Sequence, residues 1–319
     1  MPKDDDGRVA RECPNSLCSP AYFKVTPGTG ITGEQDVVYC PYCKHVAEPS
    51  NFTTQEQIRY AKDIALREAQ GGIDDMIKDA LRLGPSGKRK MGGGLISMEM
   101  SYKPSPPHHV RRPYEDEVRR DVVCPHCTLD QTVFFGLATW CSGCGKDIFL
   151  THVSAEIAVT QSMLKDVARR EQDLGKRVAA KDLENCLEDA VSIFEASLKA
   201  LVRRALTERG HDPASIDSQM KKIGNSFQST ERSKEQLLKL FGCSPSQPDL
   251  WERLSRCFAK RHPVTHNLGV VDKKYLERAQ QAEQEGREVR ISENEVAALL
   301  EDIYSAISDI HRALAGAGA

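Results

Sequence analysis

Two hydrophobic patterns follow one another along the chain, and they change near residue 154. Before that point, short runs of strand-forming residues, such as AYFKV, DVVYC and QTVFFGLATW, stand between stretches rich in glycine and proline. Runs of this kind are typical of short strands joined by turns. After that point, apolar residues recur at spacings of three and four, which is the period of an amphipathic helix. The sequence therefore predicts an α+β chain with a helical C-terminal half.

The helical half is expected to form a bundle. Its clearest apolar stripe lies within residues 178–208 and comprises Leu183, Leu187, Ala190, Phe194, Leu198, Leu201 and Ala205. Further helices are predicted at 155–174, Glu231–Phe241 and Asp249–Phe258, and a last helix is expected after a capping box of Ser292 and Glu295. Because the stripes of four or five such helices can be buried only against one another, we expect a four- or five-helix bundle.

A connector is predicted in the N-terminal half. Thr54 and Gln57 fit a capping box at the start of a helix. Gly71-Gly72 is expected to interrupt this helix, after which IDDMIKDALRL resumes the helical pattern. The stretch GPSGKRKMGGG is expected to be a flexible basic linker, and LISMEMSYKP alternates like a strand.

The cysteines point to two metal centres. Eight of the eleven cysteines form four close pairs, which are Cys13 and Cys18, Cys40 and Cys43, Cys124 and Cys127, and Cys141 and Cys144. Two such pairs supply four soft thiolate donors for a closed tetrahedron, so we expect two structural Zn²⁺ ions. No catalytic metal is expected, because four cysteines leave no position for water. Reduced core cysteines and a redox CxxC pair are the alternatives.

Three cysteines, Cys186, Cys243 and Cys257, lie outside these pairs in the helical half. Cys257 stands beside Leu254 and Phe258 and is expected in the core, while a catalytic thiol is the alternative for all three.

The domain organisation follows from these patterns. We expect a zinc ribbon at 1–52, a helical connector at 53–85, a strand, a linker and a second zinc ribbon at 86–150, and a bundle at 151–319.

Charge and hydropathy narrow the classes of partner. The 319 residues include 44 basic and 46 acidic side chains, so nucleic-acid binding would have to come from local patches. Such patches are Lys88-Arg89-Lys90, Arg111-Arg112 and Arg119-Arg120. Tyr22, Phe23, Phe134, Phe135 and Trp140 could stack on bases or fill small ribbon cores, and the core is favoured for most of them. The start MPKDDDGRVA is no secretory signal, and no apolar run spans a bilayer, so we expect a cytoplasmic protein that does not contact membranes.

One polar stretch, RHPVTHNLGVVD at residues 261–272, follows the helix of Asp249–Phe258. Pro263 is expected to bend or end that helix. Arg261 could hold two phosphate oxygens, and His266 could transfer a proton near neutral pH. RNA cleavage needs little more: a base for the 2′-hydroxyl, an acid for the leaving 5′-oxygen, and a cation at phosphorus.

This stretch resembles the signature of HEPN domains, in which an arginine, a polar residue and three variable residues precede a histidine. The resemblance covers about residues 154–315. It implies a dimeric helical bundle with metal-independent endoribonuclease activity that leaves 2′,3′-cyclic phosphate and 5′-hydroxyl ends. It also implies Arg261 at the scissile phosphate, His266 as general acid and base, and His262 in the polar position between them. Glu195 on the long helix is the candidate supporting residue, with a plain i,i+4 ion pair to Lys199 as the alternative.

The family often serves as toxins or in defence against phage, so the resemblance also implies an antitoxin or another regulatory partner. Three other interpretations remain open. Arg261 and His266 could be structural groups at a helix end, or His262 and His266 could bind a metal, although no nearby acid completes such a site. The whole chain could instead be a non-catalytic zinc-ribbon adaptor whose bundle dimerises and binds RNA or a partner protein.

Overall fold

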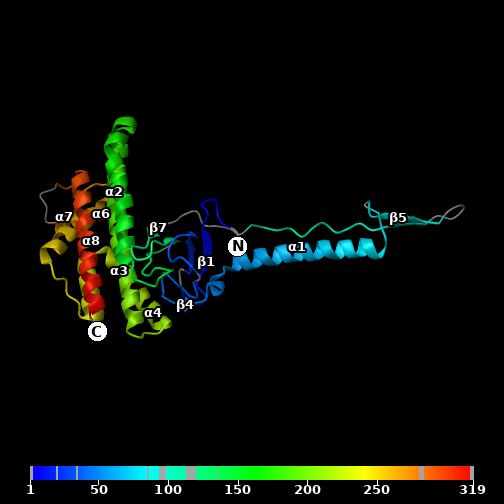
Figure 1. Cartoon of the computed structure of the whole chain (residues 1–319). Coiled ribbons are helices and arrows are strands. Elements are labelled where there is room, and N and C mark those ends of the chain that lie inside the picture. Colours follow the sequence, from blue (N-terminus) through cyan, green and yellow to red (C-terminus); the bar gives the residue numbers. More distant parts are fainter. Residues whose placement is uncertain are drawn as a thin grey trace.

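The computed structural model describes residues 3–18, 21–33, 35–84, 86–92, 98–112, 120–134, 136–279 and 284–316. It confirms the α+β fold class, with the strands and four-cysteine clusters in the N-terminal part and a helical C-terminal part (Figure 1). The strands are β1 (Val9–Glu12), β2 (Tyr22–Val25), β3 (Val38–Tyr39), β4 (Val46–Ala47), β5 (Lys88–Met91), β6 (Met98–Ser101), β7 (Arg120–Val123) and β8 (Asp130–Val133). The α-helices are α1 (Gln55–Ala80), α2 (Phe149–Leu174), α3 (Lys176–Glu208), α4 (Pro213–Ile223), α5 (Thr230–Phe241), α6 (Pro248–His266), α7 (Lys273–Ala279) and α8 (Glu293–Gly316). Two short 3₁₀ helices are η1 (Pro49–Phe52) and η2 (Ser226–Gln228).

The two cysteine-rich segments share one sheet. Its four antiparallel strands are ordered β1-β2-β8-β7, so that β2 of the first segment pairs with β8 of the second. Phe23 lies opposite Val133 in this register, and both side chains are fully buried. A single cysteine-rich segment of this size has too little apolar material for a core of its own, and joining two of them gives a common core.

An arm stands off this sheet. Helix α1 begins at the predicted capping box, in which Thr54 and Gln57 exchange hydrogen bonds. The predicted break at Gly71-Gly72 is wrong, because α1 runs through both glycines to Ala80. The basic linker is also partly wrong, since β5 within it pairs with β6. This hairpin lies at the far end of α1 from the sheet (Figure 1).

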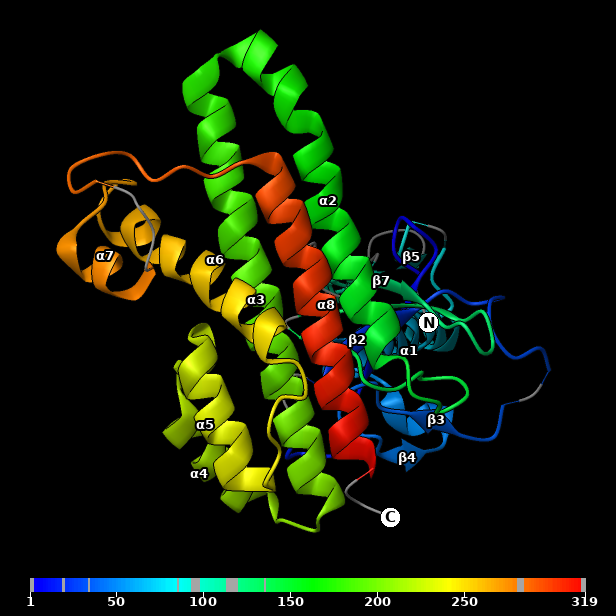
Figure 2. The same ribbon diagram turned by 90° about the vertical axis from the view of Figure 1, so that its left-hand side faces the viewer.

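The bundle is built around α3. In Figure 2, α2, α3 and α8 run side by side while α6 crosses α3 and α8. Gly175 alone separates α2 from α3, and its φ of 90° belongs to the left-handed region that glycine adopts readily. The predicted stripe is buried along α3, where Leu198 and Phe194 are completely inaccessible to solvent. Two short helices, α4 and α7, were not predicted, because seven to eleven residues carry too little periodicity.

The prediction that Pro263 ends the helix is wrong by three residues, and the predicted bend there stays a prediction. Helix α6 continues past this proline to His266. An interior proline removes one helical hydrogen bond and crowds the carbonyl four residues earlier, but here the chain beyond it is held by two hydrogen bonds to its own carbonyl. The carbonyl oxygen of Pro263 accepts from the N–H of Asn267 at 2.9 Å and from that of Gly269 at 2.8 Å. Among the helices described, none is both long and apolar enough to cross a membrane.

Candidate functional site

Two groups of four cysteines can each hold a metal ion. Cys13, Cys18, Cys40 and Cys43 form the first group, and Cys124, Cys127, Cys141 and Cys144 form the second. Within each group all sulfur atoms lie within 4.8 Å of one another. The shortest Sγ–Sγ distances are 3.6 Å in the first group and 3.5 Å in the second. These distances are far longer than a disulfide bond of about 2.0 Å.

Three of the four cysteine turns share one backbone geometry. The residue after the second cysteine, which is Lys44, Thr128 or Gly145, has φ between 61° and 66°. Its N–H donates to the carbonyl of the first cysteine at 2.9–3.1 Å. Such tight turns hold the cysteine side chains on one side of the chain, where they can share an ion. Gly145 has a further reason to lack a side chain, since a Cβ there would lie 2.7 Å from the ring of Tyr39.

The protonation of the remaining thiols argues against a catalytic cysteine. Burial raises the pKa of Cys186 and of Cys257 to about 11, and it raises the pKa of Cys243 as well. A reactive thiol needs a lowered pKa. Cys186 is completely buried in the bundle core, and Cys257 packs against that core, as predicted.

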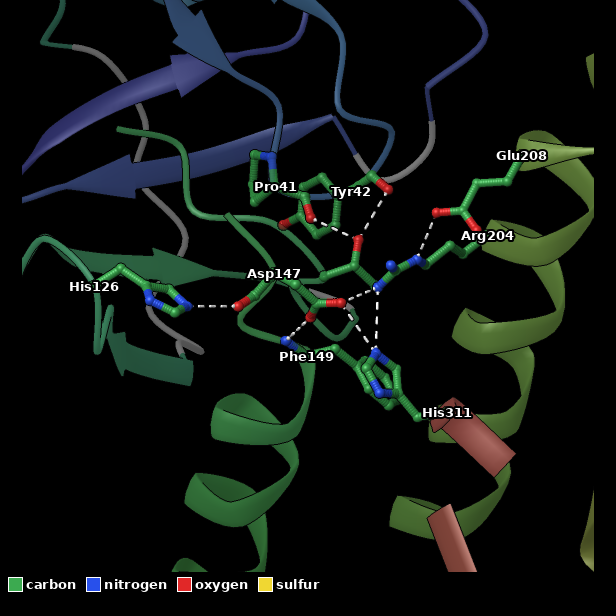
Figure 3. Close-up of polar contacts among 9 residues, drawn as sticks. Pro41, Tyr42, His126, Asp147, Phe149, Arg204, Glu208 and His311 are labelled. Carbon is green, nitrogen blue, oxygen red and sulfur yellow. Dashed lines mark hydrogen bonds and ion pairs between the residues drawn. The ribbon is translucent and has the colours of Figure 1, made fainter. Parts of the chain in front are cut away.

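The second cluster is tied to the bundle by Asp147, which follows it directly (Figure 3). One carboxylate oxygen of Asp147 lies 2.5 Å from Nη1 of Arg204 on α3 and 3.0 Å from Nε2 of His311 on α8. The other oxygen accepts from the N–H of Phe149 at the start of α2. Burial acts to raise the pKa of Asp147, but the bonds from His311 and Arg204 outweigh it and hold that pKa far below the ordinary aspartate value. One carboxylate on the segment after the second cluster thus contacts α2, α3 and α8.

Trp140 extends this junction toward the first cluster. The guanidinium of Arg204 lies 4.2 Å from the centre of the Trp140 ring, and the ammonium of Lys44 lies 3.7 Å from it. Trp140 precedes Cys141 of the second cluster, while Lys44 follows Cys43 of the first. Both clusters and α3 therefore meet at one aromatic ring. Phe23, Phe134 and Trp140 are buried, which fits the core role predicted for these aromatics, whereas Phe135 lies outside the described residues.

The arginine–histidine stretch borders an open groove between α5 and α6 with a volume of about 1130 Å³. Arg261, His262 and Thr265 contribute to its wall. Basic and acidic side chains both line it, among them Arg232, Lys234, Arg256, Glu231, Glu235 and Glu252. The groove can therefore offer cations to a phosphate while remaining open to solvent.

A chain of hydrogen bonds holds Arg261 in the groove wall. Its Nη1 donates to Oε1 of Gln228 in η2 at 2.9 Å. The amide nitrogen of Gln228 donates in turn to Oε2 of Glu195 on α3, also at 2.9 Å. Glu195 also pairs with Lys199 at 2.6 Å, which confirms the i,i+4 ion pair, while its role as a supporting residue stays a prediction. Gln228 was missed because it lies in a short polar segment without periodicity or motif.

The two histidines of this stretch are described to different extents, because the structure describes the side chain of His262 but not that of His266. Nε2 of His262 lies 3.5 Å from a carboxylate oxygen of Asp272, within ion-pair distance when the imidazole is protonated. His266 is the last residue of α6, and its side chain lies outside what the structure describes. Arg261 and His266 are five positions apart on one helix, which brings them about 8 Å apart along its axis at 1.5 Å per residue.

Compared with known proteins, the chain matches no protein-family model, no curated protein and no solved structure.

Proposed function

We propose that the bundle is a metal-independent endoribonuclease and that the two cysteine clusters hold structural zinc. The observation that carries the proposal is the chain from Glu195 through Gln228 to Arg261, which fixes a guanidinium in the wall of an open groove. A partly buried hydrogen-bond chain of this kind restricts the rotamers of a long side chain, as a phosphate-binding group requires. The HEPN-like pattern of Arg261, His262 and His266 gives the same assignment.

The reaction transfers a phosphoryl group within the RNA. A base takes the proton of the 2′-hydroxyl, the 2′-oxygen bonds to the adjacent phosphorus, and the bond from phosphorus to the 5′-oxygen breaks. An acid returns a proton to that 5′-oxygen, leaving a 2′,3′-cyclic phosphate and a 5′-hydroxyl. Arg261 stabilises the charge on phosphorus, and His266 moves the protons. Asp272 orients His262. In the sequence His262 stands between Arg261 and His266, and it lines the groove.

Zinc is the metal that fits the clusters best. A tetrahedron with Zn–S bonds of about 2.3 Å has sulfur atoms about 3.8 Å apart. The short distances of 3.6 and 3.7 Å in the first cluster, and of 3.5 and 3.8 Å in the second, are close to that value. Four thiolates close the coordination shell, so both ions are assigned a structural role.

The test is cleavage of an RNA pool by purified protein with EDTA in excess, with product ends mapped and zinc content measured afterwards. The proposal expects wild-type cleavage to 2′,3′-cyclic ends and its loss in Arg261→Ala and in His266→Ala. Arg203→Ala and His211→Ala are the matched controls, because both residues are exposed and remote from the groove. Equal cleavage by all five proteins would assign the activity to a contaminant.

A second candidate is a non-catalytic adaptor whose bundle dimerises and binds RNA or a protein. It is favoured by the junction at Asp147 and Trp140, which fixes both cysteine clusters rigidly to the bundle. An adaptor keeps its biological function in Arg261→Ala and His266→Ala and loses it when a cluster is removed. A dimer through the bundle, and a role in a toxin system or phage defence with a regulatory partner, follow from the HEPN resemblance alone.

A further inference from the structure

The arm formed by α1 and the β5–β6 hairpin is a built element. Its return segment is bonded along the helix, with the hydroxyl of Tyr102 donating to Asp74 at 2.5 Å and the ring of His108 within 2.9 Å of Asp63. At its root, Gln57 is buried and donates to the carbonyl of Ala10. The rest of α1 nevertheless lies clear of the sheet and the bundle (Figure 1).

One face of this arm is apolar and uncovered. Leu66, Ala69, Ile73, Met76 and Ala80 recur at spacings of three and four along α1. Leu66, Ile73 and Met76 are 55%, 57% and 72% exposed. The return segment bonds to another side of the helix, at Asp63, Gln70 and Asp74. This spacing is that of the contact seam of a two-helix coiled coil.

Two other features indicate that the arm is incomplete alone. Gly71 and Gly72 weaken an unsupported helix, because each loses more backbone freedom than alanine on folding. The β5–β6 hairpin has only two strands, and an isolated pair of strands is marginal in water. Met98 in this hairpin is 62% exposed. A helix and a hairpin of this kind become stable when another surface covers them.

We propose that the arm pairs with the arm of a second copy of this chain in antiparallel orientation. The seam is self-complementary in that orientation. When Ala69 faces Ile73 of the partner subunit, Leu66 faces Met76 of the partner subunit, and a two-fold axis repeats both contacts. A large side chain then meets a small one at the centre, and two large ones meet on either side.

The charges along the seam select the antiparallel orientation. In this register Lys62 reaches the end of the other helix, beside Asp79 of the partner subunit. A parallel pair would instead set lysine against lysine and aspartate against aspartate. The register also carries the hairpin of each copy, with Lys88 and Lys90, toward the start of the other arm, where Glu12 and Glu48 lie. Pairing of the arms is independent of the proposed cleavage and of any dimer through the bundle.

The test is the concentration dependence of the mass of the full chain in sedimentation velocity. Leu66→Glu/Ile73→Glu is expected to halve the mass found for the wild type at the same concentration. The matched control is Val159→Glu/Leu174→Glu, whose side chains are 60% and 58% exposed on α2 and which should leave the mass unchanged. Unchanged helicity and metal content establish that each variant is folded.

A charge exchange tests the orientation. Lys62→Glu and Asp79→Lys should each weaken association several-fold, and the two together should restore it. In a parallel pair Lys62 would face Lys62 of the partner subunit, so stronger association of Lys62→Glu mixed with wild type would refute the antiparallel orientation. Unchanged association in both single variants would refute the contact between Lys62 and Asp79 of the partner subunit. If the mass of the Leu66→Glu/Ile73→Glu chain equals that of the wild type, self-association of the arm is refuted. If the Leu66→Glu/Ile73→Glu chain lost RNA binding while its mass equalled that of the wild type, self-association of the arm would also be refuted. The arm would then be assigned to nucleic-acid binding.

Discussion

Replacement of Asp147 by alanine is expected to loosen the junction between the sheet and the bundle. The substitution removes the acceptor for Arg204 and His311 and the acceptor for the first N–H of α2. Arg204 keeps its bond to Glu208 at 2.9 Å and its contact with the Trp140 ring. Its guanidinium is therefore not left without a partner, which limits the cost of the substitution.

The magnitude can be worked from these contacts. A side chain that accepts a backbone N–H at a helix start contributes about 1 kcal/mol. A hydrogen bond to a charged group contributes about 1.5–3 kcal/mol. Together they predict a loss of about 3 kcal/mol in the free energy of unfolding for Asp147→Ala. Asp147→Asn keeps one acceptor oxygen, replaces the other with an NH2 group and removes the charge, so a loss of about 2 kcal/mol, smaller than that of Asp147→Ala, is expected for it.

Denaturant unfolding followed by helical circular dichroism measures both variants. The pKa of Asp147 is held below its ordinary value, so its contribution is complete at neutral pH and is lost as the pH falls through the folded-state value. The difference between wild type and Asp147→Asn should consequently shrink below about pH 4. Asp166→Ala, which removes an exposed carboxylate on α2, is the control and should leave the free energy of unfolding nearly unchanged. A loss below 1 kcal/mol for Asp147→Ala, or a difference that grows with acid, would refute this reasoning.

Three further outcomes are expected. Gln228→Ala should lower RNA cleavage by about 100-fold through misplacement of Arg261, while Gln172→Ala, on an exposed part of α2, should not. If Gln172→Ala lowered RNA cleavage as much as Gln228→Ala, Gln228 would have no specific role in positioning Arg261. Cys141→Ser should remove one of two zinc ions per chain in elemental analysis, whereas Cys257→Ser, outside both clusters, should keep two. Leu198→Ala should destabilise the bundle by about 2–5 kcal/mol in denaturant unfolding, because the side chain is fully buried, and a cost near zero would place it outside the core.

Long periodic patterns were the most informative part of the sequence for the fold. The stripe from Leu183 to Ala205 predicted α3, and a capping box correctly marked the start of α1. Predictions failed where a single residue type was given too much weight. Gly71-Gly72 was expected to interrupt a helix and Pro263 to bend or end one, but α1 runs through both glycines and α6 runs three residues past the proline, although an interior glycine costs a helix about 1 kcal/mol and a proline about 3 kcal/mol.

The sequence by itself determined the composition of the two cysteine clusters, since paired spacings of two to four intervening residues bring thiolates together locally. It also singled out Arg261 and His262 as site residues but placed them after the helix at Asp249–Phe258, whereas the structure extends α6 through both residues and sets them in the groove wall. Only the tertiary structure decided that β2 and β8 join both cysteine-rich segments in one sheet, that Gln228 links Arg261 to Glu195, and that Asp147 holds three helices. Those contacts join residues that are distant in the chain. Their pairing depends on how whole helices and strands pack, so no local spacing in the sequence predicts it.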